Sequence, residues 1–69
     1  MSEVVTTKAQ DGVLIITLNR PESKNAVNRA LALKMVEAID KLEADQTLRA
    51  AVITGAGSTF CSGMDLKAF

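Results

Sequence analysis

Residues 60–67, with the sequence FCSGMDLK, have the residue types that could stabilise a developing negative charge. A glycine turn that leads into the first turn of a helix leaves main-chain N–H groups without partners. Such groups can hold an oxyanion where they converge beyond the carboxyl end of a strand in an α/β sheet. An ordinary glycine turn into a capped helix explains the same residues, and the pattern alone slightly favours this simpler interpretation.

Other groups that could do chemistry have weaker support. Cys61 could be a nucleophile, but the chain has no histidine to activate it, so a small buried side chain is favoured. Asp65 follows Gly63 at the spacing of a residue that starts a helix, which favours capping over an acid–base role. The glycines at 55 and 57 match neither the dinucleotide fingerprint nor the P-loop spacing, so we expect no nucleotide-binding loop.

The elements that would position this segment follow from the apolar pattern. Residues 4–10 are weakly strand-like, and Asp11-Gly12 suits the positive φ angles of a hairpin turn. Residues 13–18 are nearly all apolar, which fits a strand buried on both faces. Residues 19–25 are polar, contain the single proline, and are predicted to form a loop.

The second half of the chain continues with a helix and a strand. Apolar residues recur at helical spacing over about 27–44, with Leu33 exposed outside the stripe, and about 50–54 is predicted to be a short buried strand. Strand, helix and strand give a right-handed crossover with parallel strands, so the fold class is α/β with the order β-β-α-β. Residues 55–67 form the loop that carries the candidate site.

Composition limits what the chain can do alone. A chain of 69 residues buries only about 60% of its unfolded surface, and one cysteine without histidine offers neither a disulfide nor a zinc site. One helix covers one face of the sheet, whereas parallel sheets nearly always have both faces covered. The sequence therefore indicates a part of something larger.

Charge and hydropathy argue against several classes of partner. Eight basic and eight acidic residues give a net charge of zero, which offers no electrostatic reason to expect nucleic acid or an anionic membrane as partner. No apolar run approaches a membrane span, and the first residues lack the features of a signal peptide. We expect no metal and a cytoplasmic location.

Two segments in order resemble the enoyl-CoA hydratase/isomerase (crotonase) family. Residues 18–21 (LNRP) with 24–26 (KNA) resemble its LNRP…NA stretch, and residues 53–66 resemble its TGxGxxFxAGxDL stretch. A helix and a strand of the expected lengths separate them. The resemblance covers about residues 4–69, almost the whole chain.

The resemblance implies the start of a spiral of ββα repeats, assembled as a homotrimer or hexamer in the complete protein. It implies that an acyl-CoA thioester is the substrate, with coenzyme A as part of that substrate and no separate cofactor. The reaction would be hydration or double-bond isomerisation of an enoyl-CoA, in which two main-chain N–H groups stabilise a thioester enolate.

The family's roles map onto particular residues here. The first oxyanion donor falls on the N–H of Met64, where many relatives have alanine. Main-chain contacts to the adenine and pantetheine are expected from Ser62, Met64, Asp65, Leu66 and Lys67, and from Lys24 and Ala26 on the other side. Lys24 could also reach a CoA phosphate.

The rest of the family's apparatus lies further along its sequence. The second oxyanion donor and the acid–base carboxylates are absent from these 69 residues, so we expect the chain alone to be inactive. Two alternatives remain open: a short non-catalytic chain that binds a partner through its exposed sheet face and Leu33, and an inactive truncated product.

Overall fold

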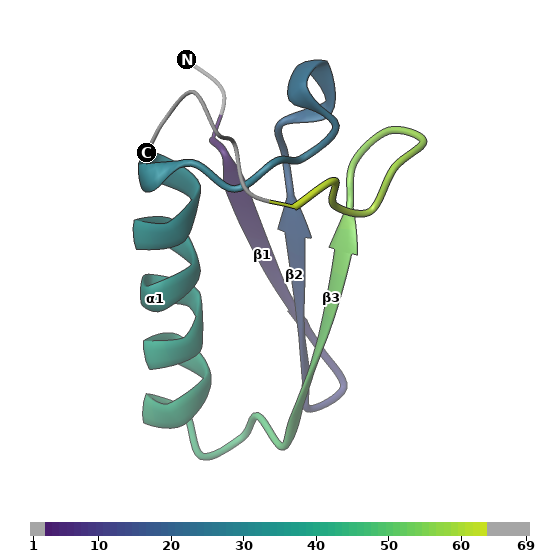
Figure 1. Cartoon of the computed structure of the whole chain (residues 1–69). Coiled ribbons are helices and arrows are strands. Elements are labelled where there is room, and N and C mark those ends of the chain that lie inside the picture. Colours follow the sequence, from purple (N-terminus) through teal and green to yellow (C-terminus); the bar gives the residue numbers. More distant parts are fainter. Residues whose placement is uncertain (1–2, 64–69) are drawn as a thin grey trace.

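Residues 3–63, which the computed structural model describes, form a three-stranded sheet with one long helix on one face (Figure 1). The sheet order is β1-β2-β3, with β1 and β2 antiparallel and β2 and β3 parallel. The predicted α/β class and β-β-α-β order are therefore confirmed. The elements are β1 (Val5–Gln10), β2 (Val13–Leu18), a short 3₁₀ helix η1 (Pro21–Ser23), α1 (Arg29–Ala44) and β3 (Ala50–Gly55).

The hairpin between β1 and β2 has the turn that its sequence predicts. Asp11 and Gly12 have φ angles of 53° and 81°, and the strands pair in register from Gln10 opposite Val13. Two successive positive φ angles match the right-handed twist of the strands, which explains the preference for aspartate and glycine. This turn lies at the far end of the sheet from the candidate site (Figure 1).

Helix α1 begins at Arg29, two residues later than the predicted start at 27. Asn28 is extended, and its side-chain oxygen accepts a hydrogen bond of 2.9 Å from the N–H of Leu31. Asn28 is therefore the N-cap of α1, and the helix begins after it because an N-cap residue has a non-helical backbone. The apolar periodicity extends past Asn28 into the preceding loop, so this pattern placed the predicted start of the helix too early.

The core lies between α1 and the facing side of β2. Alternate residues of β2 point into it, and Leu14 and Ile16 are wholly buried. The intervening residues of β2 are only half-buried, so the prediction that 13–18 is buried on both faces is wrong for the described residues: no layer among them covers the outer face. The remaining members of the core are Val5, Leu18, Leu31, Ala38 and Leu48.

Strand β3 is exposed, which corrects the prediction of a buried strand at 50–54. Ile53 pairs with Ile16 and so shares its face, yet it is 43% exposed, and Val52 on the other face is 51% exposed. Helix α1 lies over β1 and β2 and leaves β3 at the open edge (Figure 1). The apolar sequence correctly marks a strand made for burial, but residues 3–63 do not supply the cover.

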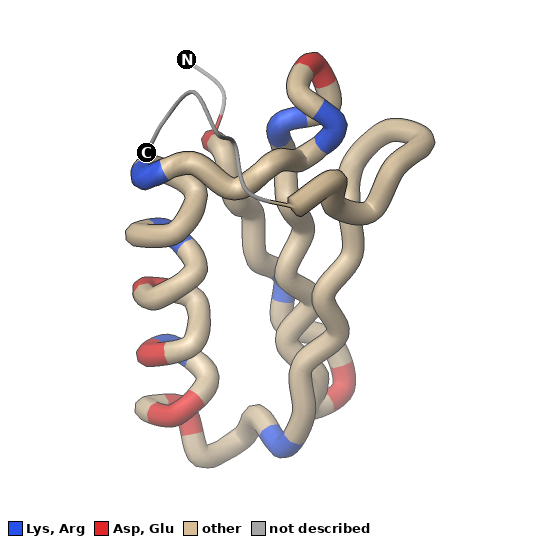
Figure 2. The backbone as a smooth tube through the Cα atoms, in the orientation of Figure 1, with Lys and Arg blue, Asp and Glu red and all other residues tan. Residues whose placement is uncertain are grey.

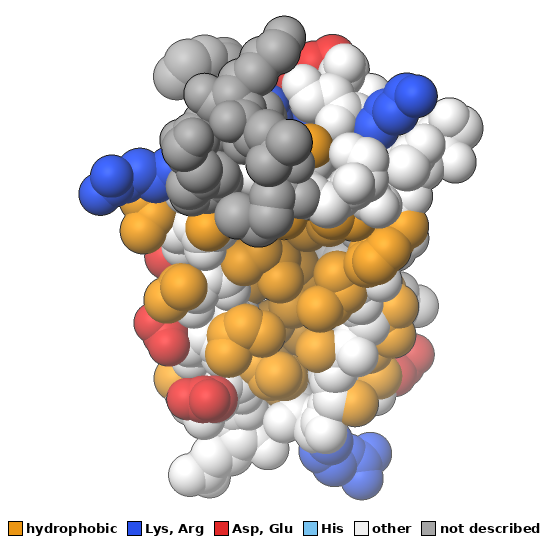
Figure 3. All heavy atoms as spheres, in the orientation of Figure 1, with side chains coloured by type: hydrophobic (Ala, Val, Ile, Leu, Met, Phe, Trp, Pro, Cys, Tyr) orange, Lys and Arg blue, Asp and Glu red, His pale blue; other side chains and the backbone are white. Residues whose placement is uncertain are grey.

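The two flanks of α1 differ in chemistry. On the β1 side, the Lys41 ammonium donates to the Thr7 hydroxyl at 3.4 Å, and Lys34 pairs with Glu37 at 3.3 Å. On the opposite flank, apolar side chains gather between α1 and β3 (Figure 3). Charged residues lie on α1, in the loops and on β1, while β2 and β3 have none (Figure 2). We call the exposed apolar residues Ile53 of β3 and Phe60 of the following loop the α1–β3 surface.

Candidate functional site

Two loops meet at the end of the sheet where β2 and β3 finish (Figure 1). Residues 19–28 follow β2 and residues 56–63 follow β3. Because these strands are parallel, both loops leave the sheet at the same edge, where ligands bind in α/β sheets. The N-terminus of α1 lies at the same end of the molecule (Figure 1).

Main-chain hydrogen bonds hold the two loops side by side. The N–H of Ser62 donates to the carbonyl of Lys24 at 3.0 Å, and the N–H of Val27 donates to the carbonyl of Gly63 at 2.7 Å. At the start of the second loop, Ala56 donates to the carbonyl of Leu18 at 2.8 Å. The structure therefore brings together residues 24–26 and 60–63, the two places at which the sequence predicts contacts to a ligand.

Asn25 lies between the loops and is wholly buried. Its Nδ2 donates to the carbonyl oxygens of Ala56 and Thr59 at 2.9 and 2.7 Å. Its Oδ1 accepts from the N–H of Arg20 at 2.7 Å. All three bonds are to main-chain groups, so this one carboxamide provides hydrogen-bond partners for two carbonyl groups and one N–H group. We call this group of bonds the Asn25 clamp.

Arg20 closes the first loop upon itself. Its guanidinium donates to the carbonyl of Ala26 and, at 3.3 Å, to the hydroxyl of Ser23. The main-chain N–H of Asn25 donates a hydrogen bond of 2.8 Å to the carbonyl of Arg20. A planar guanidinium with several donors suits this role better than a lysine would.

Lys24 and Asn25 both have left-handed backbone conformations, with φ angles of 52° and 57°. Asparagine tolerates this region, but for a lysine it is uncommon. Two such residues in succession persist only where the surrounding bonds fix them, and such strain concentrates at functional sites. The bonds around Arg20 and Asn25 supply that constraint.

Glycines at both ends of the second loop are required for different reasons. A Cβ atom on Gly55 would lie 2.7 Å from both Asn25 Nδ2 and the carbonyl oxygen of Thr59, so no side chain fits there. Gly63 has open space around it but a φ of 108°, which L residues rarely adopt. The first glycine makes room for the Asn25 clamp, and the second sets the direction of the backbone.

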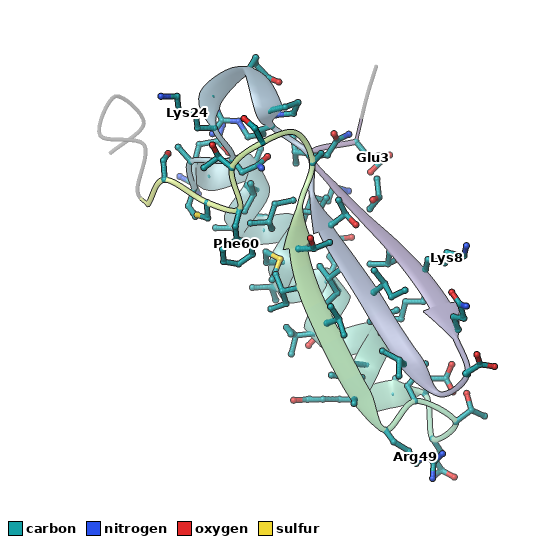
Figure 4. All side chains as sticks on the ribbon, turned by 90° about the vertical axis from the view of Figure 1, so that its right-hand side faces the viewer. Glu3, Lys8, Lys24, Arg49 and Phe60 are labelled. Atoms are coloured by element: carbon teal, nitrogen blue, oxygen red, sulfur yellow. The ribbon has the colours of Figure 1, made fainter. Side chains whose placement is uncertain are left out.

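The predicted site residues fall in different environments. Lys24 is exposed, and its side chain points outwards from the loop (Figure 4). Ala26 is buried, with its N–H donated to Ser23 at 3.0 Å and its carbonyl accepting from Arg20, which leaves one lone pair of that carbonyl. Ser62 is exposed, but its N–H is engaged by Lys24, so it offers a ligand its carbonyl and hydroxyl.

The remaining predicted positions, Met64, Asp65, Leu66 and Lys67, lie outside the described residues. Cys61 is half-buried against the core, and its sulfur lies 4.0 Å from the carbonyl of Gly63.

Asn25 and Arg20 were missed as site residues, although both lie within the stretches that carry the family resemblance. Two signals point to them. An asparagine beside a lysine in a loop without glycine suits a left-handed turn. An arginine directly before proline, in a loop next to a buried strand, is placed to bond carbonyls that proline and tight turns leave open.

Other kinds of site find no support in residues 3–63. They hold no group of three or more histidine, cysteine or acidic residues able to bind a metal ion, and no helix among them is long and apolar enough to cross a membrane. A groove between β1 and α1 is lined by both lysines and glutamates and shares no residue with the two loops.

Comparison with known proteins defines the class of this chain. Residues 8–69 match the family model described as enoyl-CoA hydratase/isomerase. The mitochondrial Delta(3,5)-Delta(2,4)-dienoyl-CoA isomerase of Mus musculus is 48% identical over 63 residues, which are 91% of this chain and 19% of that protein.

Solved structures agree with the family match. A probable enoyl-CoA hydratase/isomerase from Mycobacterium abscessus aligns with a TM-score of 0.96 and 51% identity, over 100% of this chain and 27% of that one. An enoyl-CoA hydratase from Mycobacterium tuberculosis H37Rv aligns with a TM-score of 0.95 and 48% identity, over 99% of this chain and 27% of that one.

The chain belongs to the enoyl-CoA hydratase/isomerase family, and it corresponds to the family's N-terminal segment. It spans only 19% to 27% of the length of these relatives.

Proposed function

We propose that this chain is the N-terminal, acyl-CoA-binding section of an enzyme that hydrates or isomerises enoyl-CoA thioesters. The observation that carries the proposal is the joining of the two family loops at the carboxyl ends of β2 and β3, through the Ser62–Lys24 and Val27–Gly63 hydrogen bonds. These bonds hold the two loops together at the edge where α/β sheets bind ligands.

The Val27–Gly63 bond fixes the end of the described loop: the N–H of Val27 holds the carbonyl of Gly63 at 2.7 Å. The next residue in the sequence is Met64, to whose N–H the resemblance assigns the role of first oxyanion donor. A donor fixed before the substrate arrives stabilises the enolate without reorganisation.

The chain's own residues would then bind and orient the thioester. Lys24, exposed beside the joined loops, is placed to attract a CoA phosphate as a point charge. Asp65, Leu66 and Lys67 would add main-chain contacts further along. The second oxyanion donor and the acid–base carboxylates would come from chain beyond this segment, and they decide between hydration and isomerisation. We further propose a homotrimer or hexamer for the complete protein.

The test is the intact mass of the purified native protein together with crotonyl-CoA hydration and 3-enoyl-CoA isomerisation by the same sample. We expect turnover from a polypeptide of the relatives' length and none from the 69-residue chain alone. A polypeptide of that length that neither turns over nor binds an acyl-CoA would overturn the proposal.

The α1–β3 surface favours partner binding as a second candidate function. The large apolar side chains of Ile53 and Phe60 are exposed there, and among residues 3–63 β3 has no neighbouring strand on one edge. The relatives with this fold have roughly four times its length. The occupant we propose is therefore the later part of an enoyl-CoA hydratase/isomerase polypeptide, bound in trans.

This second candidate is tested by mixing the chain with the Mycobacterium tuberculosis enoyl-CoA hydratase from which the matching quarter has been deleted. A 1:1 complex on native mass spectrometry supports it, and Ile53→Lys is expected to abolish that complex while Leu33→Lys leaves it. Leu33 is similarly exposed but lies outside the α1–β3 surface, so this candidate does not include the contact from Leu33 that the sequence suggested. A complex that is insensitive to Ile53→Lys would contradict this account.

A further inference from the structure

Asn25 is the only wholly buried polar side chain among residues 3–63. Its amide joins residues 31 and 34 positions away in the sequence, Ala56 and Thr59, to the loop that follows β2. Buried side chains with polar groups are retained where every group has a partner, and no buried polar side-chain atom in the described part of the chain lacks one.

We propose that Asn25 is a positioning residue: its carboxamide fixes the course of residues 56–63 and thereby the place from which the chain continues after Gly63. This inference rests on the proposed function, because the residue that follows Gly63 in the sequence is the expected oxyanion donor. Asn25 itself is not expected to touch the substrate.

The distribution of hydrogen bonds in the loop supports this role. The ends of residues 56–63 are held by main-chain bonds, from Ala56 to Leu18 at the start and from Ser62 to Lys24 at the finish. The middle is held by the two bonds from Asn25 Nδ2 to the carbonyls of Ala56 and Thr59. Without that amide, the two carbonyls lose their partner and the middle of the loop can shift.

The chemistry of the site restricts the residue to asparagine. Two carbonyl oxygens face Nδ2, so the position requires two donors, while Arg20 N–H requires an acceptor on the same group. An ionised aspartate has acceptors only and would face two carbonyl oxygens without a proton. The close approach of Gly55 leaves no room for the longer glutamine to take up another position.

Asn28 provides a matched control three residues away. Its side-chain oxygen caps α1 through Leu31 N–H, and it has no part in the Asn25 clamp. Loss of either asparagine is expected to destabilise the fold, but of these two side chains only that of Asn25 joins the two loops. A merely structural role for Asn25 predicts that both substitutions act on stability alone.

The experiment compares Asn25→Asp and Asn25→Ala with Asn28→Ala in the complete enzyme that carries this segment. For the Asn25 variants we expect kcat for enoyl-CoA to fall about 10²-fold, the loss typical of one oxyanion donor, with KM changed by less than about threefold. Asn28→Ala should lower Tm and leave kcat within about twofold. Deuterium exchange at the amide of Ser62 should accelerate in the Asn25 variants only.

Two results would overturn the inference. One is a folded Asn25→Asp enzyme with kcat within twofold of wild type and an unchanged Ser62 amide. The other is an equal fall of kcat in Asn28→Ala. A complete wild-type enzyme without enoyl-CoA turnover would instead overturn the proposed function, and the Ser62 amide would still decide whether Asn25 fixes the loop.

Discussion

The loop end of this chain, where residues 19–28 and 56–63 meet, differs from its α1–β3 surface in how far residues 3–63 satisfy the groups that lie there. At the loop end, Asn25 is wholly buried and its polar groups have partners within residues 3–63. On the α1–β3 surface, Ile53 is exposed on a strand whose apolar sequence predicts burial, and Phe60 is exposed on the loop that follows it. The geometry of the two loops is therefore set within residues 3–63, whereas the hydrophobic layer at β3 is not completed by those residues.

The accessible surface agrees with this division. The chain exposes 4836 Å², whereas a self-contained monomer of 7.3 kDa exposes roughly 4,200 Å². Large apolar side chains contribute to this exposed surface, among them Val52 and Ile53 of β3. Hydrogen bonds can fix a loop with a few residues, but a two-sided sheet requires a second layer.

The largest effect should come from Gly55→Ala, which attacks the loop end directly. The added methyl group would collide with Asn25 Nδ2 and the carbonyl of Thr59, so the Asn25 clamp cannot form. Overpacking together with two unsatisfied carbonyls should lower the free energy of unfolding by about 3 kcal/mol or more. Urea unfolding of the complete enzyme measures this, with the exposed neighbour Thr54→Ala as control. A Gly55→Ala change as mild as that of Thr54→Ala would show that the loops are not locked.

Ile53→Lys tests the other region. If the α1–β3 surface is covered in the complete enzyme, a lysine at 53 buries an unpaired charge there and should destabilise by about 3 kcal/mol. Leu33→Lys, at an exposed position outside that surface, should change stability by less than about 0.5 kcal/mol. Equal and small effects of both substitutions would mean that the surface stays open to water.

Asn28→Ala separates the helix from the loops. Removal of the N-cap leaves the N–H of Leu31 without its partner and should lower the free energy of unfolding by about 1 kcal/mol. Thermal unfolding gives the magnitude. Because the cap lies outside the Asn25 clamp, exchange at the amide of Ser62 should be unchanged, and an accelerated exchange would show that the loop end is not independent.

Lys24→Ala sharpens the ligand assignment. The exposed ammonium group is expected to contribute one surface charge to a CoA phosphate, so KM should rise about threefold with kcat unchanged. Steady-state kinetics with a pantetheine thioester that lacks the nucleotide phosphates provides the control, because KM for it should not respond. A fall in kcat instead would assign Lys24 to the strained turn and not to the ligand.

The smallest effect concerns Asp45 at the far end of α1. The Thr47 hydroxyl at 2.6 Å, then the Thr47 N–H and the charge of Lys41, lower the pKa of this exposed carboxyl below its usual value of about 3.9. Since the folded-state pKa is depressed, its contribution to stability is present above the unfolded pKa and is lost as pH falls through the lowered one. NMR titration should show the Asp45 pKa rising in Thr47→Ala, and an unchanged pKa would contradict the cause given.

The sequence predicts the strands, turn and helix of this fold better than it predicts which of their side chains are buried. The Asp11-Gly12 turn and the helical stripe through Leu31 depend on local chemistry, so their patterns are sufficient. The exposure of Ile53 depends on where α1 lies over the sheet, and no local pattern encodes that. The start of α1 was predicted two residues early because the apolar spacing continues past the Asn28 cap.

The candidate site was predicted in outline only. The resemblance places Lys24, Ala26 and Ser62 near one another, and the structure shows these residues in joined loops. The engagement of the Ser62 N–H and the burial of Asn25 follow from contacts between loops about 35 residues apart. A single sequence shows which residues could form such bonds, but not which ones do.

The most direct test of this account is a chimera in which these 69 residues replace the matching segment of the Mycobacterium tuberculosis enoyl-CoA hydratase. The aligned portions have a TM-score of 0.95, so the loops should meet the rest of that enzyme in their own geometry. We predict crotonyl-CoA hydration within about tenfold of the parent enzyme, with the α1–β3 surface covered. A folded chimera that neither binds nor hydrates crotonyl-CoA would contradict the assignment of these loops to the acyl-CoA site.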